Sequence, residues 1–224
     1  ERRMNTVSPS LVLASRSPRR RELLERLGLA HTVDAANIDE SPLSGEAPRD
    51  HVKRLARAKC ETVAARHAGD VVIIAADTTV DVDGEIFGTP RDVAHAREML
   101  QRLSGRTHLV HTAVCVARGS ADPVRGRLDA ARGSGDAARG GGDQPRCELD
   151  TAAVTMVPID PDLLERYLAT GESLDKAGAY AVQGEAAAFV ASVNGHITTV
   201  VGLPVRLVER LVAPFGLLPT HTHP

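Results

Sequence analysis

One uninterrupted apolar run constrains the fold of this chain more than any other part of its sequence. Residues 71–76 read VVIIAA, a short run rich in strong β-formers. Such a run is typical of a strand that is buried on both faces of its sheet. The run ends at Asp77, and open α/β sheets place ligands and catalytic groups at the ends of their strands. We therefore expect an α/β protein with Asp77 in its active site; the alternative is that Asp77 only caps the next turn.

The segment SLVLASRSPRRRELLERL predicts a strand, a turn and a helix whose first turn is unusual. Ser17 and Pro18 occupy the N-cap and the first helical position. Arg19 and Arg20 follow at once, although the positive end of the helix dipole disfavours cations there. Because the free N–H groups of a helix N-terminus already bind anions, these two arginines predict an anionic ligand. The alternative is a basic turn that only contacts solvent, which is what we expect of Arg21.

The other hydrophobic patterns complete an alternation of strands and helices. A short strand is expected at the start of the connection HTVDAANIDESPLSGEAP. Two turn signals, Asp83-Gly84 and Asn194-Gly195, each predict a hairpin. We predict further strands over residues 108–117 and 149–157, and helices over residues 48–67, 92–103, 160–170 and 204–214.

Residues 118–147 have a different composition from the rest of the chain. They contain the near-duplicate heptads DAARGSG and DAARGGG and almost no large apolar residue. Such a segment cannot bury enough surface to offset its ordering entropy, so we predict a disordered extension. The alternative, a nucleic-acid-binding segment of the RGG type, lacks aromatic residues and is diluted by aspartate. Residues 1–9 and 216–224 are expected to be flexible termini.

Charge and cysteine usage exclude several classes of protein. The net charge of −2 gives no general case for binding nucleic acid or a membrane surface. No apolar run approaches the roughly 20 residues of a membrane span. The three cysteines, Cys60, Cys115 and Cys147, are odd in number and lack metal-type spacing. We therefore expect a cytoplasmic protein with reduced cysteines and no structural zinc.

Lys59 and Glu40 are two further candidates for the site. Lys59 lies in the middle of the apolar face of the helix predicted at residues 48–67, where it either covers the edge of the core or enters a cleft. Glu40 and its neighbour Asp39 are ordinary solvated acids unless the fold brings them near Asp77. If it does, the carboxylates form a hard-oxygen site for Mg²⁺ or Mn²⁺. Together these residues indicate a metal-dependent enzyme that acts on phosphoanhydrides.

Three separated motifs then resemble one known family. They are LVLASRSPRRRELLERLG, AADTTVDVDGEIFGTPRDVAHAREMLQRLSGRTH and GESLDKAGAYAVQGEAAAFVASVNGHITTVVGLP. In this order they resemble the Maf family of septum-formation-associated nucleotide pyrophosphatases. The resemblance spans residues 10–215, interrupted only by the low-complexity segment. It implies one domain of the Maf/inosine-triphosphate-pyrophosphatase type, with an elongated mixed sheet and two lobes flanking a central cleft.

The resemblance also implies an activity, a cofactor and a set of site residues. The implied activity is hydrolysis of a nucleoside triphosphate to monophosphate and pyrophosphate, a house-cleaning reaction that uses a divalent metal cation. The forms SPRR and AVQG resemble the subgroup that acts on dTTP and UTP. A homodimer is plausible by the same resemblance, and neither nucleic acid nor membrane is expected as a partner. The catalytic and metal-binding residues implied are Asp77 and Glu40, and the substrate-binding residues are Ser15, Arg19, Arg20, Lys59, Thr78 and Gln183.

One position departs from the family pattern. The turn after the first hairpin often carries a lysine, as G-x-K-P, whereas this chain has Gly88-Thr89-Pro90. Arg91 could supply part of the missing charge, or Thr89 could hydrogen-bond a phosphate oxygen. The loss also leaves two alternatives open. One is a nucleotide-binding regulator of cell division with little catalysis, and the other is a pyrophosphatase of the 7-methyl-GTP type.

Overall fold

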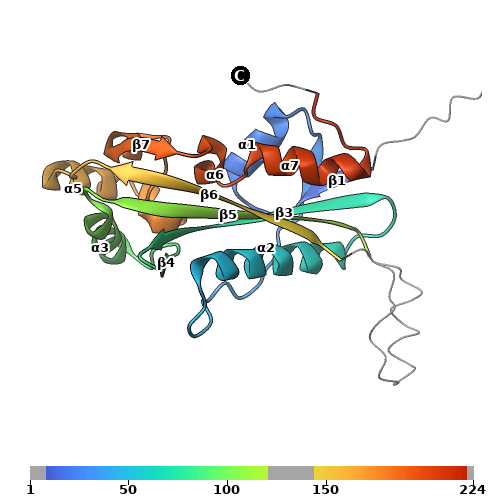
Figure 1. Ribbon diagram of the computed structural model, residues 1–224, viewed down its shortest axis with the longest axis horizontal. Coiled ribbons are helices and arrows are strands. Elements are labelled where there is room, and N and C mark those ends of the chain that lie inside the picture. The colour runs from blue at the N-terminus through green and yellow to red at the C-terminus, as the bar shows by residue number, and fades with distance from the viewer. Residues whose placement is uncertain (1–8, 121–143, 221–224) are drawn as a thin grey trace, which may run out of the picture.

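Three long strands form the centre of the fold: β3 (Val71–Val82), β5 (Thr107–Arg118) and β6 (Arg146–Met156) (Figure 1). The computed structural model describes residues 9–120 and 144–220. The sheet has seven strands in the order β2-β1-β3-β5-β6-β7, with β4 paired to the edge of β3. The remaining strands are β1 (Ser10–Leu13), β2 (His31–Val33), β4 (Glu85–Phe87) and β7 (Val190–Asn194). Because β1 is parallel to β2 and β3 while the other pairs are antiparallel, the expected mixed sheet is confirmed.

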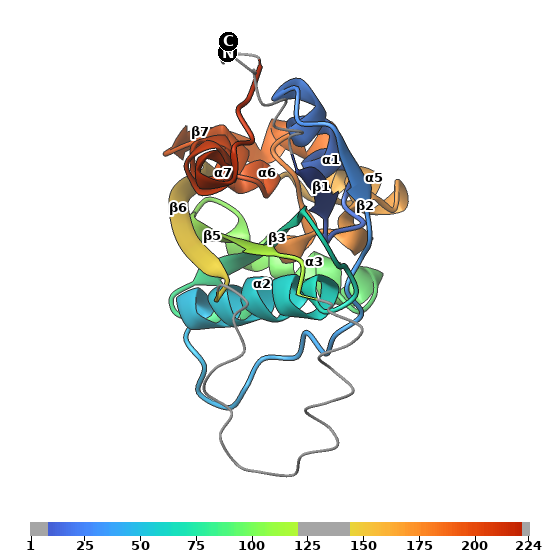
Figure 2. The same cartoon turned by 90° about the vertical axis from the view of Figure 1, so that its right-hand side faces the viewer.

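The apolar run of β3 is buried on both faces, as predicted. Ile73 and Ala75 pack with α2 (Pro48–Ala64), while Ile74 and Ala76 pack with α1 (Pro18–Arg26) and α7 (Val205–Val212). Side chains alternate across a strand, so one continuous run supplies two cores. Figure 2 shows α2 on one side of the strands and α1 and α7 on the other.

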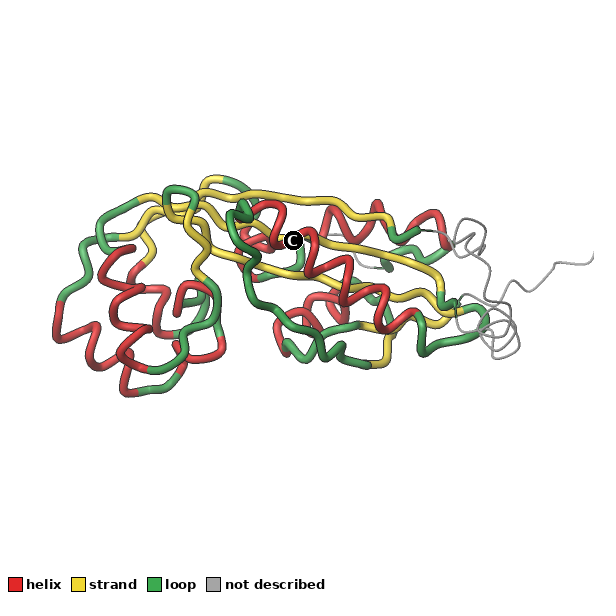
Figure 3. The backbone as a smooth tube through the Cα atoms, turned by 90° about the horizontal axis from the view of Figure 1, so that it is seen from below, coloured by secondary structure: helices red, strands yellow, loops and turns green. Residues whose placement is uncertain are grey.

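A third core lies at the far end of the long strands. Val80, Val110 and Val154 pack there with α3 (Val93–Leu103) and α5 (Pro161–Ala169). Tyr167 of α5 meets Phe189 edge to face, with ring centroids 5.2 Å apart. Figure 3 shows the helices in two groups along the strands. Short 3-10 helices join α5 to β7 at Glu172–Asp175, Ala177–Ala179 and Glu185–Phe189.

The hairpin at Asp83-Gly84 is confirmed, but the one at Asn194-Gly195 is not. Asp83 and Gly84 both have positive φ, 56° and 87°, as a two-residue type I′ turn requires. After Asn194, however, the chain enters α6 (Ile197–Val201) instead of a second strand. The β-branched residues of this segment favour a strand, but tertiary packing against β5 and β6 overrides that local preference.

The prediction of disorder over residues 118–147 is wrong at both ends of that range. Arg118 still belongs to β5, and β6 already begins at Arg146. The rest of that prediction, residues 121–143, lies outside the described residues. The predicted flexible C-terminus is also wrong for its first residues. Leu217 is buried in the core, and the backbone N–H of Thr220 donates to the carbonyl of Leu27 at 3.0 Å.

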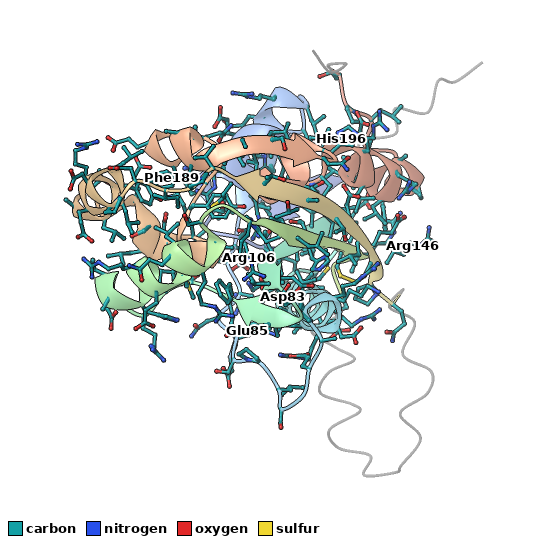
Figure 4. All side chains as sticks on the ribbon, turned by 60° about the vertical axis from the view of Figure 1, so that its left-hand side comes forward. Asp83, Glu85, Arg106, Arg146, Phe189 and His196 are labelled. Atoms are coloured by element: carbon teal, nitrogen blue, oxygen red, sulfur yellow. A yellow bond between two sulfur atoms is a disulfide. The ribbon has the colours of Figure 1, made fainter. Side chains whose placement is uncertain are left out.

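Cys115 and Cys147 form a disulfide, so the prediction of reduced cysteines is wrong for this pair. The two residues lie directly opposite each other on β5 and β6, with their Cα atoms 4.1 Å apart. Figure 4 shows the bond in yellow near Arg146, where β6 begins. Cys60 is free and buried. Among the described residues, no helix has the length and apolar character to cross a membrane.

Candidate active site

A cleft of about 1130 Å³ lies over the middle of β3. One wall comes from α1, the connection after β2 and α2; the other comes from β4, α3 and residues 175–183. Every residue that the sequence marked as catalytic or substrate-binding lines it. These residues are Ser15, Arg19, Arg20, Glu40, Lys59, Asp77, Thr78 and Gln183.

The pairing of β3 explains why the cleft forms at Asp77. On one edge, β3 pairs with β5 from Val72 to Asp81. On the other edge, it pairs with β1 only as far as Ile74 and with β4 only from Val80. The gap between these two partners leaves the edge open where Asp77 and Thr78 lie. Strand β3 therefore supplies the floor of the cleft as well as the centre of the core.

Asp77, Lys59 and Glu40 form a charged group at that floor. Lys59 Nζ lies 2.6 Å from Asp77 Oδ1 and 2.9 Å from Glu40 Oε1. Asp77 is 6% exposed and Lys59 is 8% exposed, whereas the Glu40 side chain is 56% exposed. Burial raises the pKa of the Asp77 carboxyl, and the positive charges of Lys59 and Arg20 oppose that shift. Lys59 thus enters the cleft instead of merely covering the core.

Arg20 is held by three elements of the fold. Its Nε donates to the carbonyl of Gly202 at 2.8 Å, Nη1 to Ser15 Oγ at 3.2 Å, and Nη2 to Thr78 Oγ1 at 3.0 Å. Burial lowers the pKa of its guanidinium, and the charge of Asp77 opposes this. Arg20 therefore links the start of α1 to β3 and to the end of α6.

The first turn of α1 has the composition of an anion site. Ser17 is the N-cap and Pro18 follows it, as predicted, but the Ser17 side chain makes no capping hydrogen bond. The turn contains no acidic residue. The side chain of Arg19 has neither a hydrogen bond nor an ion pair to any described residue. Its guanidinium is therefore available to a ligand in the cleft, next to the free N–H groups of the helix.

A second charged group, which sequence reasoning missed, fixes the connection that carries Glu40. Glu46 accepts from Arg54 Nε at 2.6 Å and Nη2 at 2.8 Å, from His51 Nδ1 at 2.9 Å and from the backbone N–H of Leu43 at 3.1 Å. These bonds lower the pKa of Glu46 to about 2, with Arg54 the largest cause. The group ties the connection to α2, which also carries Lys59. Nothing in the sequence marks Glu46, because its partners lie on another element.

The opposite wall holds Gln183 and a lysine that the sequence did not assign. Gln183 is exposed and follows the buried Tyr180, whose hydroxyl lies 2.5 Å from His108 Nε2. Lys176 donates to Asp175 Oδ1 at 2.7 Å and to the backbone carbonyl of Glu172. Thr89 and Arg91 line the same wall, so the turn that lacks its usual lysine does face the cleft.

Comparison with known proteins gives one consistent result. The family described as Maf-like protein matches residues 10–215. A dTTP/UTP pyrophosphatase of Anaeromyxobacter dehalogenans strain 2CP-1 is 48% identical, over 94% of this chain and 96% of that protein. Proteins with the same name from Anaeromyxobacter sp. strain Fw109-5 and Myxococcus xanthus are 45% and 43% identical, over 92% and 94% of this chain and 89% and 97% of theirs. A crystal structure of a Vibrio cholerae protein matches with a TM-score of 0.33 at 10% identity, over 75% of this chain and 76% of that chain.

Proposed function

The chain belongs to the Maf family, and from that premise we propose that it is a nucleoside triphosphate pyrophosphatase acting on dTTP and UTP. The observation that carries the proposal is the convergence of two acids and three cations on one cleft. Glu40, Asp77, Lys59, Arg19 and Arg20 come from four separate segments, and all of them line it. The names of the relatives support the choice of substrate.

The cations are arranged to hold a triphosphate. Arg19 and the N-terminus of α1 lie on one side, and Lys59 lies at the floor beside the acids. Charge-assisted hydrogen bonds from such groups fix the phosphate chain and offset its charge. The negative charge missing from the first turn of α1 is then supplied by the substrate.

Asp77 is the proposed general base. A water oxygen attacks the α-phosphorus, its proton passes to Asp77, and the bond between the α-phosphorus and the bridging oxygen breaks. Pyrophosphate leaves while the cations stabilise its charge. Because burial raises the pKa of the Asp77 carboxyl, its carboxylate is a stronger base than that of an exposed aspartate.

A divalent cation fits this cleft if it arrives with the nucleotide. Glu40 and Asp77 both contact Lys59 Nζ, so oxygen donors from two elements meet at one place. The described residues contain no group of three or more His, Cys, Asp or Glu that could hold a metal alone. Mg²⁺ commonly binds one or two carboxylates and completes its shell with substrate phosphates and water. When bound, the cation would neutralise phosphate charge; Glu40 and Asp77 are the residues that would hold it.

Gln183 is the proposed contact to the base. Its amide can donate and accept at once, which suits the edge of a pyrimidine that also carries both functions.

We propose a homodimer as well, which light scattering of the purified protein would test. The cytoplasm is the proposed location; the Cys115–Cys147 disulfide argues against it, because cytosolic thiols are kept reduced.

A substrate panel tests the proposed function. Purified protein with Mg²⁺ or Mn²⁺ is offered dTTP, UTP, CTP and 7-methyl-GTP, and released pyrophosphate is measured. We expect the highest kcat/KM with dTTP and UTP. A preference for 7-methyl-GTP would reject the pyrimidine assignment, and absence of pyrophosphate with every nucleotide would reject the enzyme.

A further inference from the structure

The side chains around Arg20 form a chain of hydrogen bonds whose polarity is fixed. Thr112 Oγ1, on β5 and fully buried, donates to the backbone carbonyl of Thr199 at 2.7 Å. Thr112 Oγ1 also lies 2.9 Å from Thr78 Oγ1. A hydroxyl has one proton, and the carbonyl can only accept, so the proton of Thr112 is committed to Thr199. Thr78 must therefore donate to Thr112.

That direction decides what Thr78 can do in the cleft. Its only proton points to Thr112, so towards Arg20 its oxygen acts purely as an acceptor, taking the bond from Nη2. Thr78 cannot donate a hydrogen bond to a phosphate oxygen without breaking the chain. The family resemblance implied that Thr78 binds substrate, but the bond polarity gives it a different task.

Ser15 also accepts from the same guanidinium, but its own proton is not committed to a neighbour. Its Oγ accepts from Arg20 Nη1 at 3.2 Å and from the backbone N–H of Ser17 at 3.2 Å. A hydroxyl oxygen has two acceptor positions, and these two bonds fill both. The proton of Ser15 has no acceptor among the described residues, and Ser15 lines the cleft. Ser15 therefore has a donor to offer to an anion, and Thr78 does not.

Helix α6 anchors the other end of this series of hydrogen bonds. Thr199 Oγ1 donates to Asp150 Oδ2 on β6, and the carbonyl of Gly202 at the end of α6 accepts from Arg20 Nε. Gly202 has a φ of 110°, and a Cβ there would lie 3.1 Å from Thr78 Oγ1. Close approach and backbone conformation thus both require glycine. Three of the five guanidinium N–H groups are used in this way, which leaves two for a ligand.

We propose that Thr112 and Thr78 are positioning residues that orient Arg20 towards the phosphates, and that Ser15 donates its hydroxyl proton to a phosphate oxygen. This inference rests on the proposed function for the identity of the ligand. The two assignments make opposite predictions when Arg20 is removed. A residue that acts through Arg20 loses its effect in an Arg20→Gln background, whereas a residue that contacts the ligand itself keeps part of its effect.

A double-mutant cycle tests the proposal with inorganic tripolyphosphate as the probe, measured by calorimetry. Thr112→Val and Thr78→Val should each raise the Kd about tenfold, the effect of disturbing one hydrogen bond to a charged group. In the Arg20→Gln background both should change the Kd less than twofold. Ser15→Ala should still raise it in that background. Undiminished effects of Thr112→Val and Thr78→Val without Arg20 would overturn the positioning role, and loss of the Ser15→Ala effect would overturn the donor role.

Two further variants guard against a simple loss of folding. Thr112→Ser keeps the hydroxyl and should restore a Kd close to that of the unmodified protein. Thr107→Val removes another contact between two threonine hydroxyls, Thr107–Thr155 at 2.9 Å, which joins β5 to β6 away from Arg20, and should leave the Kd unchanged. Failure of Thr112→Ser to restore binding would also reject the positioning role of Thr112. The probe is not a nucleotide, so the double-mutant cycle can support the positioning roles even if the substrate panel rejects the enzyme. Equally, the panel can support the enzyme even if the cycle rejects these roles.

Discussion

Lys59 on α2 places its Nζ 2.6 Å from Oδ1 of Asp77 on β3, and the same nitrogen lies 2.9 Å from Glu40. One ammonium group thus contacts two carboxylates. A triphosphate entering the site brings negative charge to the same ammonium group. The acids would then be freed to hold a cation or to accept a proton, which links substrate binding to activation of Asp77.

Asp77→Asn should remove turnover while the protein stays folded. The amide keeps the shape of the side chain but cannot accept a proton from water, and general-base catalysis contributes about 10²–10⁴-fold. We expect kcat to fall by at least about 10²-fold. Pyrophosphate release measures the loss, and circular dichroism with a melting curve checks the fold. Full activity in a folded variant would contradict the role of Asp77.

The pH profile of kcat/KM should have an acid limb above that of an exposed aspartate. Burial raises the pKa of the Asp77 carboxyl, so the group is protonated, and inactive as a base, at pH values where an ordinary aspartate is ionised. Lys59 opposes this shift, and Lys59→Gln should therefore move the limb to still higher pH. A limb that stays fixed or moves to lower pH in this variant would show that another group controls it.

Glu46→Gln should loosen the connection that carries Glu40. The bonds from Arg54 lose the negative charge of their acceptor, and one partly buried donor loses its partner, which lowers the free energy of unfolding by about 1–3 kcal/mol. The pKa of Glu46 is lowered to about 2, so its stabilisation is present above its unfolded pKa and disappears as the pH falls towards 2. The melting-temperature difference between the two proteins should therefore shrink from pH 6 to pH 2. A constant difference would mean that the charge of Glu46 is not the cause.

Removal of the Cys115–Cys147 disulfide should lower stability without affecting catalysis. The bond closes a loop with a sequence separation of 32 residues and joins two strands that are already paired. Loop-closure entropy of the unfolded chain predicts a loss of about 3–4 kcal/mol for Cys147→Ser. Denaturant melts measure it, and thiol titration of the native protein shows whether the bond forms. Three free thiols in protein purified without reductant would contradict the bond. Glu148→Gln, beside the bond on β6, is the control for the effect of a substitution at this place in the strand.

Much of the fold could be predicted because its main elements have strong local patterns. The run at residues 71–76 required burial on both faces, and the two cores beside β3 meet that requirement. In residues 197–201 the local pattern and the structure differ. Their β-branched side chains favour a strand, yet they form α6, because packing against β5 and β6 determines the outcome. The 3-10 helices between Glu172 and Phe189 have no periodic pattern that could have marked them.

The candidate site was also predictable only in part. Single residues such as Asp77 and Lys59 could be found from their position after an apolar run or on an apolar helix face. The expected strand end at Asp77 is wrong, however, because β3 continues to Val82. Relationships between distant residues could not. The disulfide depends on strand register, and the role of Thr78 depends on which neighbour receives its proton. Such facts arise from the assembled fold, and no spacing along the chain contains them.

Thr89→Lys should improve the enzyme. Thr89 is exposed and lines the cleft at the turn where the family often has a lysine. A new charge-assisted contact to a phosphate oxygen is worth about 1.5–3 kcal/mol, which corresponds to at least about tenfold in binding. We expect a lower KM, a smaller gain in kcat and a stronger dependence on salt. Thr89→Gln, with no charge, is the matched control. Unchanged kinetics in the lysine variant would show that the neighbouring Arg91 already supplies the missing cation. In that case Arg91→Gln should raise the KM.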